Sequence, residues 1–158
     1  SVQFSKKSQI QAIEKNAFLN SIITSLTFPP TLTELKEGWC DCAIMLNEIN
    51  VMPGNPRYSL YENKFIIGKS SSEIENYDVL VFCKRNIEKV QIPNFIKIIG
   101  SYSFGNCSIT TIEFPVDSRV EIIEKNSFIY SSIQKVTLPS SLTKICEGAF
   151  KNCHEQKY

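Results

Sequence analysis

The feature that most constrains this chain is a hydrophobic pattern that ends in proline and recurs along the sequence. In segments 23–29, 87–93, 109–115 and 133–139, an aliphatic residue is followed by apolar residues three and five positions later and then by proline. A fifth copy, Leu46 to Val51, has Met52 at the proline position and Pro53 one residue later. Prolines 29, 53, 93, 115 and 139 are therefore 24, 40, 22 and 24 residues apart. A recurring period of this length indicates a repeat architecture.

Each copy of the pattern predicts a short β-strand with one buried face. Val136 and Leu138, for example, alternate with Lys135 and Thr137, which is the period of a strand. Proline has no amide hydrogen and cannot continue a ladder, so it should end every strand at the same depth. Strands that recur in this way predict a solenoid with one parallel sheet, in which successive coils stack at roughly 4.8 Å.

A second pattern lies between the prolines. Two aliphatic residues three positions apart lead to a small residue followed by phenylalanine, as in Ile10 and Ile13 with Ala17-Phe18, Ile96 and Ile99 with Ser103-Phe104, Val120 and Ile123 with Ser127-Phe128, and Leu142 and Ile145 with Ala149-Phe150. A spacing of three is typical of helical or 3-10 segments. We therefore expect an α/β repeat fold, rich in β-structure, in which short helical or 3-10 return segments connect the strands.

The long interval between Pro53 and Pro93 predicts an insertion over residues 54–86 within the third coil. Strand-like runs at 58–61 and 65–67 flank a polar turn, and a further run covers 77–82, so we expect a small β-meander. Insertions in repeat proteins often form a distinctive binding surface. The candidate residues on this surface are Tyr58, Tyr61, Glu62, Asn63 and Lys64. A decorated loop without a binding role is the alternative.

Length and charge limit what the chain can do. Its 158 residues fit one array, 1–158, of about six coils, two of them incomplete at the ends. Seventeen basic and 16 acidic residues give a formal net charge of +1, without a long basic block, so we expect no nucleic-acid partner. The longest apolar runs, such as Val79 to Cys83, are too short to cross a bilayer, and no membrane span is predicted.

Residues suited to catalysis or metal binding are scarce. The single histidine, His154, lies near the C-terminus, so we expect no enzyme and no catalytic residue. The motif Cys40-Asp41-Cys42 lacks the second ligand pair of a zinc site, so no metal and no cofactor are predicted. Cys40 stands at a core phenylalanine position, which favours a buried thiol. Cys83 and Cys146 are the thiols that we expect to be exposed.

The repeat unit resembles the BspA-like leucine-rich repeat of surface proteins from anaerobic bacteria and protozoan parasites. The clearest stretch runs from Ser140 to Cys153, and the interrupted third coil is similar to that of protozoan members. The resemblance implies a leucine-rich-repeat solenoid and a role in attachment or recognition at the cell surface. Trp39-Cys40 departs from the family pattern, in which a small residue and phenylalanine are expected, and indicates rearranged packing in the second coil.

The candidate binding surface is the polar side of the main strands. Its members alternate with the buried residues and form the expected concave face: Ser25, Thr27, Glu48, Asn50, Lys89, Gln91, Thr111, Glu113, Lys135 and Thr137. An ordinary solvated sheet face is the competing interpretation. We predict a non-catalytic binding or adhesion module, located at the cell surface or outside the cell, whose partner is a host or matrix protein or a glycan. Self-association through open coils at the two ends and an intracellular scaffold are the alternatives.

Overall fold

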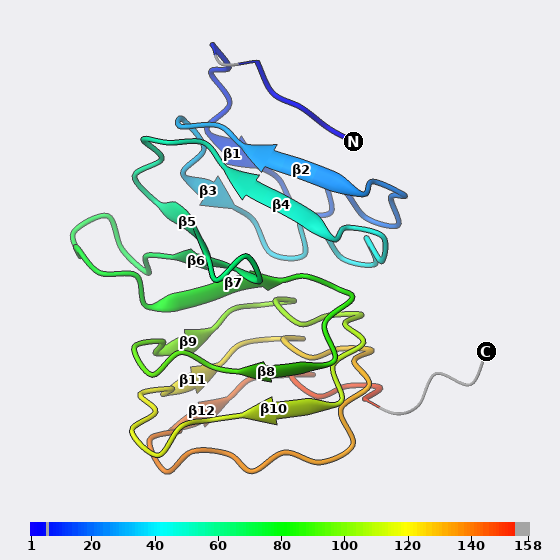
Figure 1. Cartoon of the computed structure of the whole chain (residues 1–158), viewed down its shortest axis with the longest axis vertical. Helices are drawn as coiled ribbons and strands as arrows, with labels where there is room; N and C mark the ends of the chain where they lie inside the picture. The colour runs from blue at the N-terminus through cyan, green and yellow to red at the C-terminus, as the bar shows by residue number, and fades with distance from the viewer. Residues whose placement is uncertain (6, 154–158) are drawn as a thin grey trace.

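The computed structural model describes residues 1–5 and 7–153, which wind into a stack of coils along the long axis of the molecule (Figure 1). The chain runs from the first coil at one end to the last at the other, without returning. The leucine-rich-repeat-like solenoid expected from the sequence is therefore present, with parallel strands contributed by successive coils.

One set of parallel strands comes from the proline-terminated pattern. It comprises β2 (Ser25–Phe28) paired with β4 (Glu48–Val51), and β8 (Lys89–Gln91) paired with β10 (Thr111–Glu113). The four strands lie one below another in Figure 1. Leu26 and Phe28 of β2 are buried, as the alternating pattern requires. Residues 133–139 form no strand, although Val136 and Leu138 still pack against the core.

A second set of parallel strands forms where helical returns were expected. It contains β1 (Ala12–Ile13) paired with β3 (Glu34–Leu35), and β9 (Ile98–Ile99), β11 (Ile122–Ile123) and β12 (Lys144–Ile145) paired in succession. No helix occurs in the described residues, so the prediction of helical or 3-10 returns and of one parallel sheet was wrong. The backbone amides and carbonyls of the return residues form hydrogen bonds from one coil to the next. For example, the amides of Glu121 and Ile122 donate to the carbonyl of Lys97 at 2.8 and 3.2 Å.

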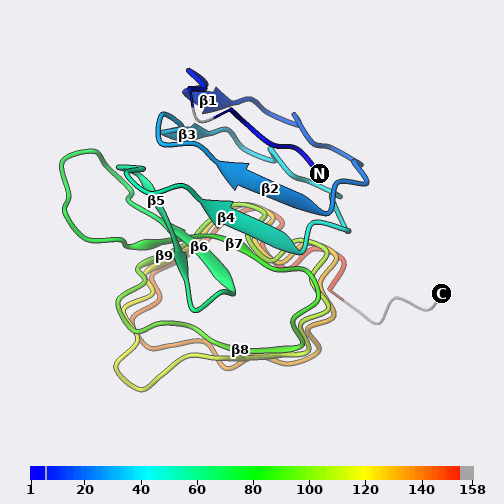
Figure 2. The same ribbon diagram turned by 45° about the horizontal axis from the view of Figure 1, so that its top comes forward.

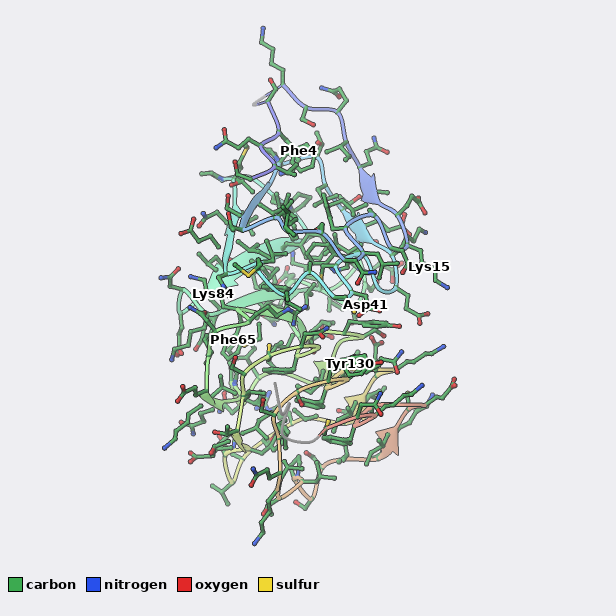
Figure 3. All side chains as sticks on the ribbon, turned by 90° about the vertical axis from the view of Figure 1, so that its right-hand side faces the viewer. Phe4, Lys15, Asp41, Phe65, Lys84 and Tyr130 are labelled. Atoms are coloured by element: carbon green, nitrogen blue, oxygen red, sulfur yellow. The ribbon has the colours of Figure 1, made fainter. Side chains whose placement is uncertain are left out.

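The turns that follow the return strands explain why no helix forms. Each six-residue turn has two left-handed residues four positions apart: Asn16 and Asn20, Gly38 and Cys42, Tyr102 and Asn106, Asn126 and Tyr130, and Gly148 and Asn152. A left-handed residue at every fourth position interrupts a right-handed helix. The turns stack on one side of the molecule, where Lys15, Asp41 and Tyr130 follow one another along the long axis (Figure 3).

Three antiparallel strands interrupt the array: β5 (Tyr58–Tyr61), β6 (Phe65–Gly68) and β7 (Val79–Cys83). The last of them, β7, pairs in parallel with β9, so the return-strand sheet continues through β7 and β6 to β5 (Figure 2). Strand order in this sheet is β12-β11-β9-β7-β6-β5. The hairpin strands thus extend the sheet of the later coils and separate it from β3.

The core divides at the same place. One hydrophobic cluster fills the coils from β1 to β4, and a second fills those from β7 to the end of the described chain. In the second cluster the repeat phenylalanines form a ladder, with the rings of Phe104, Phe128 and Phe150 stacked at centroid distances of 4.9 Å. In the first cluster, Trp39 packs edge-on against Phe18 and Phe28 instead.

Candidate functional site

The main strands place the candidate polar side chains in register. Ser25 lies beside Glu48 and Thr27 beside Asn50 on β2 and β4. Lys89 lies beside Thr111, and Gln91 beside Glu113, on β8 and β10. All eight side chains are at least partly exposed, but β4 and β8 do not pair, so the structure divides them into two patches.

The two candidate residues beyond β10 lie outside any strand. Lys135 and Thr137 are exposed and, together with Glu113, line a shallow cavity of about 640 Å³. The apolar part of its lining includes Phe114, Leu138 and Val116, whose side chain is fully exposed. The candidate surface of the later coils thus extends past the last main strand.

The hairpin presents its turn to solvent. Glu62 and Asn63 both have positive φ, at 49° and 52°, and the amide of Lys64 donates to the carbonyl of Tyr61 at 3.0 Å. This is the conformation of a tight hairpin turn, which favours asparagine. Tyr58 lies elsewhere: it is 7% exposed and packs edge-on against Phe28.

A cavity of about 360 Å³ joins the hairpin turn to the main strands. Tyr61, Glu62 and Lys64 line one side of it, and Gln91 and the segment from Ile92 to Asn94 line the other. The ring of Tyr61 packs edge-on against Phe95, which fixes the hairpin over the end of β8. The structure therefore brings part of the predicted insertion surface next to part of the predicted strand face.

A buried cation that sequence reasoning missed lies where the two core clusters meet. Arg85 is 3% exposed, and its guanidinium lies over the ring of Phe82, 4.4 Å from the centroid. Nη1 donates to the carbonyl of Ser103 at 3.1 Å and contacts Cys107 Sγ at 3.5 Å, and Nη2 contacts Cys40 Sγ at 3.4 Å. No ion pair to a carboxylate is formed by Arg85 within residues 1–5 and 7–153.

The missing turn explains this arrangement. The other return strands lead into a six-residue turn, but only Lys84, Arg85 and the segment 86–88 separate β7 from β8. The amide of Cys83 donates to the carbonyl of Ser103 at 2.9 Å. Arg85 fills the interior beside Cys40, which occupies the phenylalanine position of its coil. We call Trp39–Cys42, Cys83–Arg85 and Cys107 together the seam. The signal for Arg85 in the sequence was a coil without the small-residue–phenylalanine pair.

Three buried thiols of the seam differ in acidity. Burial raises the pKa of the Cys40 thiol to about 11, against the opposing charge of Arg85. Burial also raises the pKa of Cys83 well above its usual value. At Cys107 burial again favours the neutral thiol, but a hydrogen bond with Cys83 and the charge of Arg85 outweigh it and lower the pKa to about 7. Cys107 is thus the group that can supply negative charge to Arg85.

The structure also bears on the remaining cysteines and on the metal and catalytic sites that the sequence argued against. All six cysteines are free, and the expectation that Cys83 is exposed was wrong, because this residue of β7 is fully buried in the second core cluster. Cys40 is buried, as predicted, and no cluster of three metal-binding side chains occurs in the part of the chain that the structure describes. The same residues include no helix that could cross a membrane. His154 lies outside the described residues.

Comparison with known proteins identifies the repeat. The sequence matches the family described as BspA type leucine rich repeat region, with six copies of the repeat, over residues 1–79 and 72–158. Because these matches cover the whole chain, the protein belongs to the BspA-type leucine-rich-repeat family. The resemblance inferred from the sequence is confirmed. No curated protein matches the chain.

Solved structures share the fold at low sequence identity. The pneumococcal vaccine antigen PcpA has a TM-score of 0.72 and 19% identity, over 90% of this chain and 40% of that one. A leucine-rich cell surface protein of Faecalibacterium prausnitzii has a TM-score of 0.58 and 20% identity, over 91% and 49%. A leucine-rich-repeat protein of Eubacterium ventriosum has a TM-score of 0.51 and 14% identity, over 94% and 63%. This chain therefore spans less than two thirds of each of them.

Proposed function

We propose that this chain is a non-catalytic protein-binding module of a cell-surface leucine-rich-repeat protein, and that it attaches to a host or matrix partner. The binding surface, which we call the hairpin face, consists of the hairpin turn, the exposed sides of β8 and β10, and the exposed residues Lys135 and Thr137 beyond β10. The observation that carries the proposal is the cavity shared by Tyr61, Lys64 and Gln91, which joins two candidate surfaces into one. Two of the structural neighbours are described as a vaccine antigen and a cell surface protein, which supports the location.

The chemistry of the hairpin face suits a protein partner. Glu62, Lys64, Lys89, Glu113 and Lys135 give an exposed mixture of both charges. Such a pattern gives specificity and orientation to an encounter more than raw affinity. Tyr61, half-buried against Phe95, supplies an aromatic side chain of the kind that anchors interfaces. A glycan partner would use the same Tyr61 ring and is distinguished by enzymatic deglycosylation of the target surface.

The test reverses charge on the hairpin face and compares it with a matched control. The variant Lys89→Glu, Glu113→Lys, Lys135→Glu alters three exposed residues of the face, and Lys97→Glu, Glu121→Lys, Lys144→Glu makes the same changes on the return-strand side. Binding of the purified, labelled chain to cultured cells and to matrix-coated plates is measured. We expect at least a tenfold loss for the first variant only. Equal binding by both variants and the parent contradicts the assignment of the face.

Self-association is a second candidate, favoured by the last coil. Among the described residues β12 has a strand partner on one side only, and Ile145 in it is 50% exposed. Unpaired strand edges with exposed apolar side chains invite pairing with another chain. Ile145→Lys should abolish any concentration-dependent increase in mass seen by light scattering. A mass that is constant across concentration for the parent chain argues against this candidate.

A further inference from the structure

The break in the array opens a wedge-shaped cavity on the return-strand side, which we call the wedge. Its volume is about 460 Å³. One wall is β3 and the residues after it, and the other is the outer surface of β7 and β9; β3 lies above β5 and β7 in Figure 1. The lining residues that the following argument uses are Leu35, Trp39, Arg57, Tyr58, Lys69 and Glu124.

The wedge exists because the coils are closer on one side than on the other. On the turn side, the backbone at Gly38 approaches Tyr102 directly, since a Cβ added to Gly38 would lie 3.6 Å from that ring. Lys125 also reaches across to Glu37 at 3.6 Å. On the opposite side, the hairpin of β5 and β6 lies between β3 and β7 (Figure 1). The two return-strand sheets therefore diverge from the turns outward.

The backbone edge of β3 that faces the wedge lacks the partners found in other coils. In those coils two carbonyls of the return segment accept amides from the next coil: Asp78 and Leu80 accept from β9, Lys97 and Ile99 from the β11 coil, and Glu121 and Ile123 from the β12 coil. The equivalent carbonyls here belong to Thr33 and Leu35. Among the described residues no backbone amide donates to either, and Thr33 receives only the Tyr58 hydroxyl, at 3.3 Å.

Charge differs between the two ends of the wedge. Arg57 and Lys69 lie at the end where β3 begins, and neither forms an ion pair within the described chain. The guanidinium of Arg57 donates from Nη2 to the carbonyl of Ser70, at 3.2 Å. At the other end, the carboxylate of Glu124 accepts from the amide and hydroxyl of Ser101 and has no cationic partner in the same residues. Trp39, Tyr58 and Leu35 give the wedge an apolar floor between these ends.

We propose that the wedge binds an extended peptide segment of a partner protein, which adds to β3 as a parallel strand. The peptide amides donate to the carbonyls of Thr33 and Leu35, and an apolar side chain contacts Trp39. An acidic side chain near its amino end meets Arg57 and Lys69, and a basic one near its carboxyl end meets Glu124. Addition of a strand to an open sheet edge is an established mode of peptide recognition, and the cavity has the size of a typical binding site. This site goes beyond the hairpin face and does not depend on it.

The chain itself supplies a probe with these properties. Residues 120–125, Val-Glu-Ile-Ile-Glu-Lys, contain the return strand β11 (Ile122–Ile123), and the amides of Glu121, Ile122 and Glu124 donate to the coil before. As an acetylated and amidated peptide aligned with β3, it places Glu121 at the cationic end and Lys125 at the anionic end. Trp39 is the only tryptophan of the protein and lines the wedge, so its fluorescence reports occupancy.

The experiment titrates this peptide into the full chain and follows Trp39 fluorescence. We expect saturable binding, weakened at least tenfold when the peptide is N-methylated at Glu121, Ile122 and Glu124, because methylation removes the three donor amides and keeps the side chains. Val79→Lys, which places a long chain in the wedge, should weaken binding similarly, and Val116→Lys, on a distant exposed residue, should not. Lys69→Glu should weaken binding of the parent peptide and restore it for a peptide with lysine in place of Glu121.

Three results overturn the proposal: no saturable response at millimolar peptide, equal binding of the N-methylated peptide, or unchanged binding by both Val79→Lys and Lys69→Glu. If Val79→Lys fails to fold, as judged by its thermal unfolding, the charge exchange at Lys69 decides alone. The variant with three reversed charges on the hairpin face should bind the peptide like the parent. Failure of this site and failure of the proposed function are therefore distinguishable.

Discussion

The later coils and the seam fill the same interior position in opposite ways. From β9 onward, each coil contributes a phenylalanine that stacks on the next, with Phe104, Phe128 and Phe150 in nearly parallel contact. At the seam the equivalent residue is Cys40, and Arg85 fills the space that its side chain leaves. The first arrangement gains stability from apolar contact alone, whereas the second buries a charge that needs a partner. A repeat array therefore tolerates a missing turn only where another side chain fills the vacated volume and has partners for its polar atoms.

Removing a ring from the middle of the ladder should have the largest effect. Phe128 is fully buried between two other rings, so Phe128→Ala should lower the free energy of unfolding by about 3 to 5 kcal/mol. The matched change at the seam, Cys40→Ala, removes one sulfur and should cost about 1 kcal/mol. Urea unfolding followed by circular dichroism measures both. Equal costs for the two substitutions would mean that the ladder and the seam do not differ as described.

The stability of the seam should depend on pH. The pKa of Cys107 in the folded chain is about 7, below the 9.0 of a free thiol. A group with a lowered pKa stabilises the fold when it is ionised, so the free energy of unfolding should rise between pH 7 and 9, by about 2 kcal/mol. Above pH 9 the raised pKa values of Cys40 and Cys83 act in the opposite direction, so the stability should then fall.

The control for this prediction removes the cation. Arg85→Met retains much of the volume and eliminates the charge that favours the Cys107 thiolate, so the rise between pH 7 and 9 should disappear. Thiolate absorbance near 240 nm should show the same change, with ionisation near pH 7 in the parent and only at alkaline pH in the variant. A rise of equal size in Arg85→Met would assign the pH dependence to some other group.

The sequence predicted the main strands better than the seam, for a physical reason. Alternation at Leu26 and Phe28 and the terminal proline define a strand without knowledge of its neighbours. The return segments were misread because two aliphatic residues three positions apart fit a 3-10 turn as well as a tight turn followed by a two-residue strand. The distinction lay in asparagine pairs such as Asn16 and Asn20, whose left-handed conformation excludes a helix.

The candidate sites also differed in how far the sequence could predict them. The polar residues of β8 and β10 could be placed from alternation, because a side chain between two buried ones must face outward. Arg85 could not, since a single cation after an apolar strand is most often exposed. Its burial follows from contacts with Cys40 and Cys107, which are 45 and 22 residues away in the sequence. The wedge likewise depends on the approach of Gly38 to Tyr102, and a contact between residues so far apart in the sequence cannot be predicted from a local pattern.

The smallest effect concerns the turns that the ladder coils share. The last left-handed position is asparagine in three coils, at Asn20, Asn106 and Asn152, but tyrosine in the fifth, where Tyr130 has a φ of 56° and is 37% exposed. A left-handed conformation costs most residues about 1 to 2 kcal/mol, and asparagine less. Tyr130→Asn should therefore raise the free energy of unfolding by about 0.5 to 1 kcal/mol. The control, Asn106→Tyr, places the same strain in a neighbouring coil and should lower it by a similar amount. Changes of opposite sign in the free energy of unfolding of the two variants, measured in urea, would establish that the turns, and not only the rings, set the stability of a ladder coil. A loss of stability in Tyr130→Asn would mean that the exposed ring contributes more by packing than it costs in backbone strain.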